Sequence, residues 1–285
     1  MIRSLPRSRR YNLIFSVYIG LFYFYLFAPL LVTVVLAFND SMFPALPWNG
    51  FALDWFFSPG PDRVGFFHDS MLLESLGTSV HVGLLVAIGS VVVGTAVAFL
   101  FEYENFPFKE GLYFLMLAPL VIPGVILGIS ILSASNSLGL FLEEALGWES
   151  EILQPGFSLV VIGQFSFIAT LTTLIILARL RKFDHTLEEA ALNLGASRLT
   201  IFWRITLPYL RPALIGAGVI AFLMSFENFN TTLFLIGPEP TFPITLYLQV
   251  RDGSTPVINA ASFILMLGTG VFALANLFFS RREKG

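Results

Sequence analysis

Six long apolar segments dominate this sequence of 285 residues. They cover approximately residues 14–38, 72–101, 111–134, 157–180, 212–236 and 256–280. Each is close to or longer than the ~20 apolar residues that a helix needs to cross the hydrocarbon core of a bilayer. The segments therefore predict an all-α membrane protein with six transmembrane helices.

The composition also indicates a chain that lies in lipid. Apolar residues make up 56% of it, and charged residues only 12%, against roughly a quarter in a soluble domain. A net charge of −3 offers no basic surface for nucleic acid, and the absence of Cys excludes thiolate chemistry. Soluble enzymes and nucleic-acid-binding proteins are thereby excluded, and membrane lipid is an expected partner.

The basic residues predict the orientation. With the N-terminus inside, all but two of the 16 Lys and Arg fall on inner segments, the exceptions being Arg63 and Arg251. Positively charged residues collect on the cytoplasmic side of membrane proteins. We therefore expect both termini to be cytoplasmic.

The chain divides into three expected parts. Residues 1–70 hold the first transmembrane helix and an external loop, whose Pro and Gly residues indicate turns rather than a separate core. Residues 71–280 form the main transmembrane domain, with a cytoplasmic loop at 181–211, and residues 281–285 form a cytoplasmic tail. A separate short amphipathic helix is expected on the outer surface around residues 138–145.

The cytoplasmic loop predicts a helix, a glycine turn and a second helix. Asp184 or Thr186 can cap the first helix, Gly195 suits its C-terminus, and Ser197 can cap the second helix, which Pro208 is expected to end. A small apolar face follows helical spacing and comprises Leu187, Ala190, Ala191 and Leu194. Residues alone leave two alternatives open, a contact surface for another protein or a helix that merely connects two spans.

A spaced motif runs through this loop. Its order is Glu-Ala-Ala, three residues, Gly, nine residues, Ile, one residue, Leu-Pro, and its members are Glu189, Ala190, Ala191, Gly195, Ile205, Leu207 and Pro208. The spacing resembles the EAA motif of ABC-importer permeases. "APLVIPGVILG", "IGP" and "INAASFIL" elsewhere in the chain are similar to the spermidine/putrescine, PotC-like, branch of that family.

The resemblance implies a type I ABC importer permease with the MetI-like fold, in a bacterial or archaeal cytoplasmic membrane. Residues 71–280 would be its type-1 transmembrane domain, and the motif would couple the chain to an ATPase. Expected partners are two copies of an ATP-binding subunit, a second homologous permease and an external substrate-binding protein. The chain has no phosphate-binding G-x-x-x-x-G-K-[ST] sequence. We therefore expect a transport subunit that binds no cofactor itself, with ATP and Mg bound by the partner ATPase subunit.

Polar residues in the fifth apolar segment are candidates for a translocation pathway. Glu227 is expected inside the membrane, where a charge costs ~2.5–3.5 kcal/mol on insertion scales. Asn228, Asn230 and Thr231 accompany it, and Gln164 lies in the fourth segment. They could line a pathway or form a structural hydrogen-bond cluster.

The substrate prediction depends on the charge near Glu227. Polyamine permeases of the resembling branch usually carry paired acidic residues here, whereas this chain has Glu-Asn. A polyamine such as spermidine or putrescine is favoured by the resemblance, and a monocationic or zwitterionic amine is equally compatible with one carboxylate. The alternative function is an ion-coupled secondary transporter that uses Glu227 as its intramembrane site.

Two glycine pairs indicate close helix packing. Gly124 and Gly128 have the small-x-x-x-small spacing, and Gly268 with Gly270 lies in the sixth segment.

Overall fold

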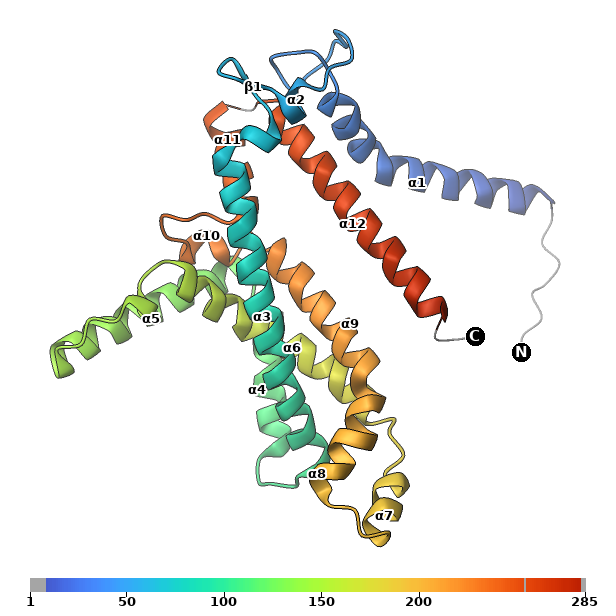
Figure 1. The fold of residues 1–285 in the computed structure, drawn as a ribbon, viewed down its shortest axis with the longest axis vertical. Helices are drawn as coiled ribbons and strands as arrows, with labels where there is room; N and C mark the ends of the chain where they lie inside the picture. The colour runs from blue at the N-terminus through green and yellow to red at the C-terminus, as the bar shows by residue number, and fades with distance from the viewer. Residues whose placement is uncertain (1–8, 254, 283–285) are drawn as a thin grey trace. The chain divides into compact units, whose positions relative to one another are not determined.

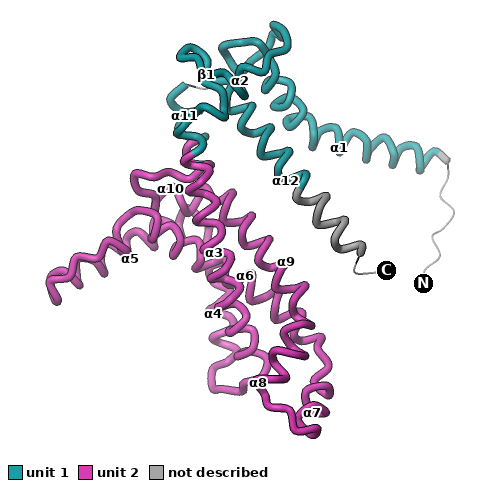
Figure 2. Tube along the Cα trace, in the orientation of Figure 1, with its two compact units in different colours: residues 1–73, 246–285 teal, residues 74–245 magenta. Residues whose placement is uncertain are grey.

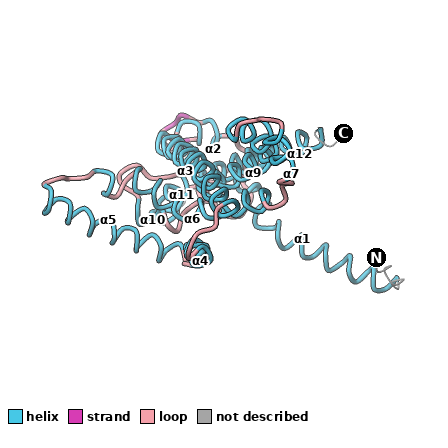
Figure 3. Tube along the Cα trace, turned by 90° about the horizontal axis from the view of Figure 1, so that it is seen from below, coloured by secondary structure: helices cyan, strands magenta, loops and turns pink. Residues whose placement is uncertain are grey.

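The computed structural model describes residues 9–253 and 255–282, and helices make up most of them (Figures 1 and 3). The α-helices are α1 Arg9–Ala37, α2 Asp54–Phe57, α3 Ser70–Tyr103, α4 Lys109–Val121, α5 Gly124–Leu146, α6 Phe157–Leu180, α7 Thr186–Asn193, α8 Arg198–Ile201, α9 Leu207–Phe226, α10 Thr232–Leu235, α11 Phe242–Gly253 and α12 Val257–Arg282. Short 3-10 helices are η1 Phe66–His68 and η2 Glu151–Leu153, and η3 Phe202–Thr206 is a π-helix. Strands β1 Pro59–Gly60 and β2 Arg63–Val64 pair antiparallel.

The chain forms two compact units (Figure 2). One comprises residues 1–73 with 246–285, and the other comprises residues 74–245. The candidate functional residues all belong to the second unit.

Helix α1 of the first unit is apolar around its whole circumference. Most of its large side chains are exposed, with Phe24 68% and Tyr25 82% accessible, and it packs against α12. A helix that is apolar all round belongs in a core or in a bilayer. The surface of α1 is therefore suited to lipid.

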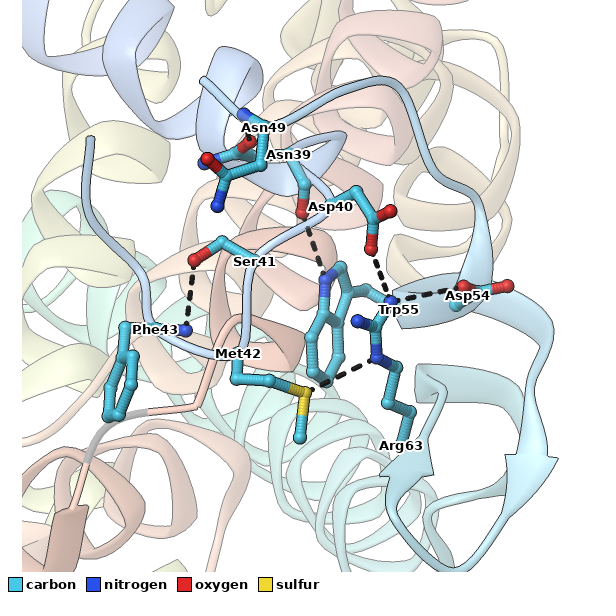
Figure 4. Close-up of polar contacts among 9 residues, drawn as sticks. All are labelled: Asn39, Asp40, Ser41, Met42, Phe43, Asn49, Asp54, Trp55 and Arg63. Carbon is cyan, nitrogen blue, oxygen red and sulfur yellow. Dashed lines mark hydrogen bonds and ion pairs between the residues drawn. The ribbon is translucent and has the colours of Figure 1, made fainter. Parts of the chain in front are cut away.

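The segment after α1 folds around Asn39 (Figure 4). The Asn39 amide donates to the carbonyls of Ala45 and Pro47 at 3.1 and 3.2 Å, and its oxygen accepts from the Asn49 N–H at 2.8 Å. The Asn39 carbonyl accepts a hydrogen bond from the buried Trp55 indole. This segment thus contains ordered structure where the sequence indicated turns alone.

Arg63 ties the same segment to the β1–β2 hairpin (Figure 4). Its guanidinium pairs with Asp40 and with Asp54, lies 5.5 Å from the centre of the Trp55 ring and donates to the Met42 sulfur at 3.3 Å. The hydrogen bond with Asp40 is the main cause that raises the pKa of Arg63.

Helix α6 is the core of the second unit. It packs against α9, α4 and α10, and side chains such as Ile168, Ile176 and Leu180 are fully buried. Gly156 is its N-cap residue and Arg181 its C-cap residue. Two of its buried polar residues bond to other helices: Gln164 bonds to α9 and α10, and Thr170 donates to the Met116 carbonyl of α4.

The predicted membrane spans are largely present as helices. Within the described residues, five helical segments are long and apolar enough to cross a bilayer: α1, α3, α5, α6 and the continuous stretch Arg198–Phe226. In the described part of α12, the apolar helical stretch Val257–Val271 is shorter. Each overlaps one of the six apolar segments of the sequence, although the third and fifth of those segments are broken.

The third segment differs from the expectation of one helix over residues 111–134. Helix α4 ends at Val121, Ile122 and Pro123 are extended, and α5 begins at Gly124. A residue that precedes a proline, here Ile122, disfavours the helical region of φ and ψ, which explains the break. Helix α5 then continues without interruption to Leu146, so the expected separate amphipathic helix at 138–145 is its last part.

The first glycine pair packs closely, as its spacing predicted. A Cβ on Gly128 would lie 2.8 Å from the Thr231 carbonyl oxygen, and one on Gly124 would lie 3.0 Å from the Asn230 Cβ. These two glycines allow α5 to approach α10. Gly268 and Gly270 have no such neighbour within the described chain, so the prediction for them is not supported there.

Candidate functional site

Helix α7 carries the Glu-Ala-Ala triplet and ends in a glycine turn. Gly195 has φ +84°, its N–H donates to the Leu192 carbonyl, and the Ala196 N–H donates to the Ala191 carbonyl. These two bonds form a Schellman motif, which requires the left-handed conformation that glycine adopts at little cost. The predicted turn at Gly195 is present.

The start of α7 is fixed by Asp184. Its carboxylate accepts from the Thr186 hydroxyl at 2.7 Å and from the Thr186 N–H at 3.1 Å. The side-chain hydrogen bond is the largest cause that lowers the pKa of Asp184, followed by the backbone one. Of the two candidate caps, Asp184 is the acceptor.

The second helix of the loop is capped as predicted but does not end at Pro208. The Ser197 hydroxyl accepts from the Thr200 N–H, and helical geometry then continues from α8 through η3 into α9. In η3 the Leu207 N–H bonds to the Phe202 carbonyl five residues back. This wider turn makes room for Pro208, which lacks an N–H and would clash in a regular α-helix.

The apolar face of α7 is not covered by the rest of the described chain. Leu187 and Ala190 are exposed, Ala191 is half-buried, and Leu194 is 89% accessible. Glu189 is also exposed. In contrast, Ile205 packs against the cluster of Leu180, Phe183 and Leu210, which lies at the ends of α6 and α9.

Glu188, beside the motif, has more partners than Glu189. Its carboxylate accepts from the Tyr103 hydroxyl at 3.0 Å and from the Thr206 hydroxyl at 2.6 Å, and His185 lies 3.7 Å away. Sequence reasoning missed this residue because Tyr103 is 85 positions distant. The feature that identifies Glu188 is the pairing of its carboxylate with the Tyr103 and Thr206 hydroxyls, and this pairing exists only in the folded chain.

A groove of 680 Å³ lies beside this carboxylate. Phe99, Tyr103, Leu192 and Phe202 contribute apolar and aromatic surface, and Glu188 contributes charge. The groove is thus lined by residues of α3, α7, α8 and η3.

Glu227 is located at the end of a helix rather than inside one. Helix α9 ends at Phe226, and the Glu227 N–H donates to the Leu223 carbonyl as a cap. Its side chain is exposed and forms no hydrogen bond or ion pair with the described residues. The expected unbroken span over 212–236 is therefore wrong, and the charge lies at a helix break.

Gln164 is fully buried and joins three segments. Its oxygen accepts from the Ser225 hydroxyl of α9, and its amide donates to the Thr232 hydroxyl of α10 at 2.8 Å. The Thr232 hydroxyl donates to the Asn228 oxygen at 2.9 Å. Gln164 and the side-chain oxygen of Asn228 thus have partners within the chain, which corresponds to the structural alternative considered for them.

Two further candidates flank the same break. Thr231 is buried and donates to the Gly124 carbonyl at 3.3 Å, whereas Asn230 is exposed. The structure thus gathers the candidate pathway residues at the α9–α10 break, and Glu227 and Asn230 are the two that are open to a ligand or to another subunit.

Comparison with known proteins identifies the family. The family described as "Binding-protein-dependent transport system inner membrane component" matches residues 90–284. The putrescine transport system permease protein PotI of Escherichia coli K12 is 30% identical over 263 residues, which are 91% of this chain and 88% of PotI. The spermidine/putrescine transport system permease protein PotC of the same organism is 28% identical over 268 residues, or 92% of each chain.

Solved structures share the fold. One is a bacterial alginate ABC transporter in complex with alginate pentasaccharide-bound periplasmic protein, with a TM-score of 0.71, 18% identity and coverage of 95% of this chain and 93% of the other. A second, from a bacterial ABC transporter involved in alginate import, has a TM-score of 0.69 at 14% identity and covers 97% and 100%. Both confirm the predicted fold class of a type I importer permease.

The family consists of membrane-embedded transport components, which confirms the predicted transport subunit in place of an enzyme. It is also a multi-pass inner-membrane family, in line with the long apolar helices. An ion-coupled secondary transporter is not favoured. The chain therefore belongs to the binding-protein-dependent transport system inner membrane components and is a permease subunit of an ABC importer.

Proposed function

We propose that this permease forms half of the translocation pathway of an importer for aliphatic polyamines. The observation that carries the proposal is the similarity to PotI and PotC along about nine-tenths of the chain. The names of both relatives state polyamine transport. An amine-containing cargo is cationic at neutral pH, and a carboxylate in its path provides the matching charge.

Glu227 is the proposed cation-binding group of this half. Its carboxylate is exposed at the α9–α10 break and has no partner among the described residues. Asn230 lies three positions further on and can replace water around an ammonium group. Thr231, Asn228 and Gln164 stabilise the break through their hydrogen bonds.

Helix α7 is proposed to receive the motion of a separate ATPase. Its exposed apolar face offers a contact, and the capped ends at Asp184 and Gly195 keep it short and rigid. The motif residues Glu189, Ala190, Ala191, Gly195, Ile205, Leu207 and Pro208 would form this coupling element. ATP and Mg would be bound by two copies of the ATPase, and no cofactor by this chain.

The remaining partners follow from the same proposal. One permease supplies half of a pathway, so a second homologous permease would provide the other half, and an external binding protein would deliver the substrate. The bias of basic residues favours an orientation with both termini in the cytoplasm.

Uptake of radiolabelled putrescine tests the proposal. The complete transporter, with its ATPase and binding protein, is expressed in cells that lack other polyamine importers. We expect uptake that requires ATP hydrolysis and is competed by spermidine. Uptake that depends on an ion gradient and survives an ATPase-inactive partner would contradict it.

Glu227→Gln tests the cation-binding group. The amide keeps the size of the side chain but removes the charge, so the KM for a diamine is expected to rise about tenfold or more, with little change in protein level. Asp252→Gln in α11 removes a carboxylate far along the chain from the break and serves as the control. Equal KM values for Glu227→Gln and the wild type would assign Glu227 a structural role.

A further inference from the structure

Helix α7 is joined to more of the chain than its two covalent connections require. Its flanking segments lead to α6 and to α8, whereas the Glu188 side chain reaches Tyr103, the last residue of α3. The same carboxylate accepts from Thr206 in the π-helix η3. One side chain thus connects three helical elements.

The contacts of Glu188 satisfy the carboxylate well. The Tyr103 hydroxyl lies 3.0 Å from both carboxylate oxygens, and the Thr206 hydroxyl lies 2.6 Å from one of them. Only 19% of the Glu188 side chain is accessible, and Thr206 is buried. Hydrogen bonds to an ionised, partly buried acceptor are stronger than neutral ones.

Neighbouring ionisable side chains place this carboxylate in a wider network. His185 lies between Glu188 and Glu102, at 3.7 and 3.5 Å from their oxygens. Arg181 lies 3.6 Å from Glu102. The ring of His185 also packs edge-on against Tyr103, so α3 and the loop before α7 meet over several side chains.

We propose that Glu188 is a positioning residue that makes the end of α3 move together with α7 and with the start of α9. The inference rests on the proposed role of α7 in coupling. The covalent connections of α7 carry a force on it to α6 and α8. Through Glu188 the force also reaches Tyr103 of α3, which is 34 residues long, and Thr206 before the start of α9.

The experiment measures coupling in the complete transporter reconstituted in proteoliposomes. Glu188→Ala is expected to raise the number of ATP molecules hydrolysed per substrate imported by about tenfold, the size of effect that loss of a hydrogen bond to a charged group produces. Glu188→Gln keeps an acceptor for Thr206 and is expected to restore part of the coupling. Glu104→Ala removes an exposed carboxylate near the end of α3 and should leave the ratio unchanged.

A double-mutant cycle separates positioning from general damage. Tyr103→Phe and Thr206→Val remove one hydroxyl each, and each should have little further effect once Glu188 is Ala. Additive effects, or an unchanged ratio in Glu188→Ala, would overturn the inference.

One variant distinguishes failure of this inference from failure of the proposed coupling role. Ala190→Arg adds a long charged side chain to the exposed face of α7 and does not touch the Glu188 network. If Ala190→Arg uncouples and Glu188→Ala does not, only the positioning inference is wrong. If neither variant uncouples, α7 is not the coupling element.

Discussion

At the scale of single residues, Gln164 shows how a polar side chain is accommodated in an apolar helix. Its oxygen and its amide nitrogen both have partners, on α9 and on α10. A buried amide with both ends satisfied stabilises a specific arrangement, whereas a partly satisfied one is costly. Gln164 thereby links the end of α9 to the start of α10.

Gln164→Leu should destabilise the permease. The variant leaves the buried Ser225 hydroxyl without its acceptor, and each unsatisfied buried group costs about 1–3 kcal/mol. We expect a lower thermal unfolding midpoint of the purified transporter. Gln154→Leu, at an exposed position, provides the matched control, and equal midpoints for both variants would contradict the role of Gln164.

Some site residues could be predicted from the sequence and others could not. Gly195, Ser197 and Asp184 act locally, so spacing alone identifies their roles. Glu188 acts through Tyr103, a contact that exists only after folding. Glu227 was expected within a span, but the nearby Asn228 accepts from the Thr232 backbone and hydroxyl groups, which competes with a continuous helix.

At the scale of elements, the glycine turn after α7 depends on backbone conformation alone. A Cβ on Gly195 would meet no atom within 4 Å, yet its φ is +84°. Gly195→Val should cost about 1–2 kcal/mol or more and lower import per ATP hydrolysed, because other residues disfavour this conformation. Gly195→Asn is expected to retain more activity, since Asn adopts the left-handed region more readily.

A second glycine provides the control for the substitutions at Gly195. Gly216 lies within α9, and a Cβ there also meets no atom within 4 Å. Gly216→Ala should therefore leave transport intact. Equal loss of coupling in Gly195→Asn and Gly195→Val would show that the side chain, not the backbone, matters at this turn.

Contact between α5 and α10 depends on Gly128. Gly128→Ala brings a methyl group to the Thr231 backbone carbonyl, which cannot rotate away, and overpacking of this kind costs about 1–3 kcal/mol. Gly139→Ala on the same helix has open space around it. We expect only the first substitution to lower the unfolding midpoint. Similar midpoints for Gly128→Ala and Gly139→Ala would mean that α10 shifts to accommodate the added methyl group.

The elements themselves were only partly predictable. Apolar length identifies α1, α3 and α6 well, since each is one uninterrupted helix. It fails at Pro123, where an apolar run continues through a backbone break. The expectation that Pro208 ends a helix also fails, because helical geometry continues past this proline. In both cases the local turn geometry, rather than hydrophobicity, decides the outcome.

At the scale of the whole molecule, the orientation in the membrane can be tested directly. The chain contains no Cys, so a single introduced cysteine is its only reactive thiol. With both termini inside, Asn49→Cys should react with a membrane-impermeant maleimide in intact cells, and Asn193→Cys only after permeabilisation. The reverse pattern would invert the predicted topology.

The π-helix between α8 and α9 also constrains how this chain can change in length. A π-turn contains one residue more than an α-turn, so deletion of the exposed Trp203 could restore a regular helix without disturbing a core side chain. Because the wider turn accommodates the additional residue, the helix beyond the deletion would keep its phase, and Ser225 would still face Gln164. The regular turn would instead bring the Pro208 ring against the carbonyl four residues earlier. A single-residue deletion here should therefore be more harmful than a substitution at the same position, because of Pro208.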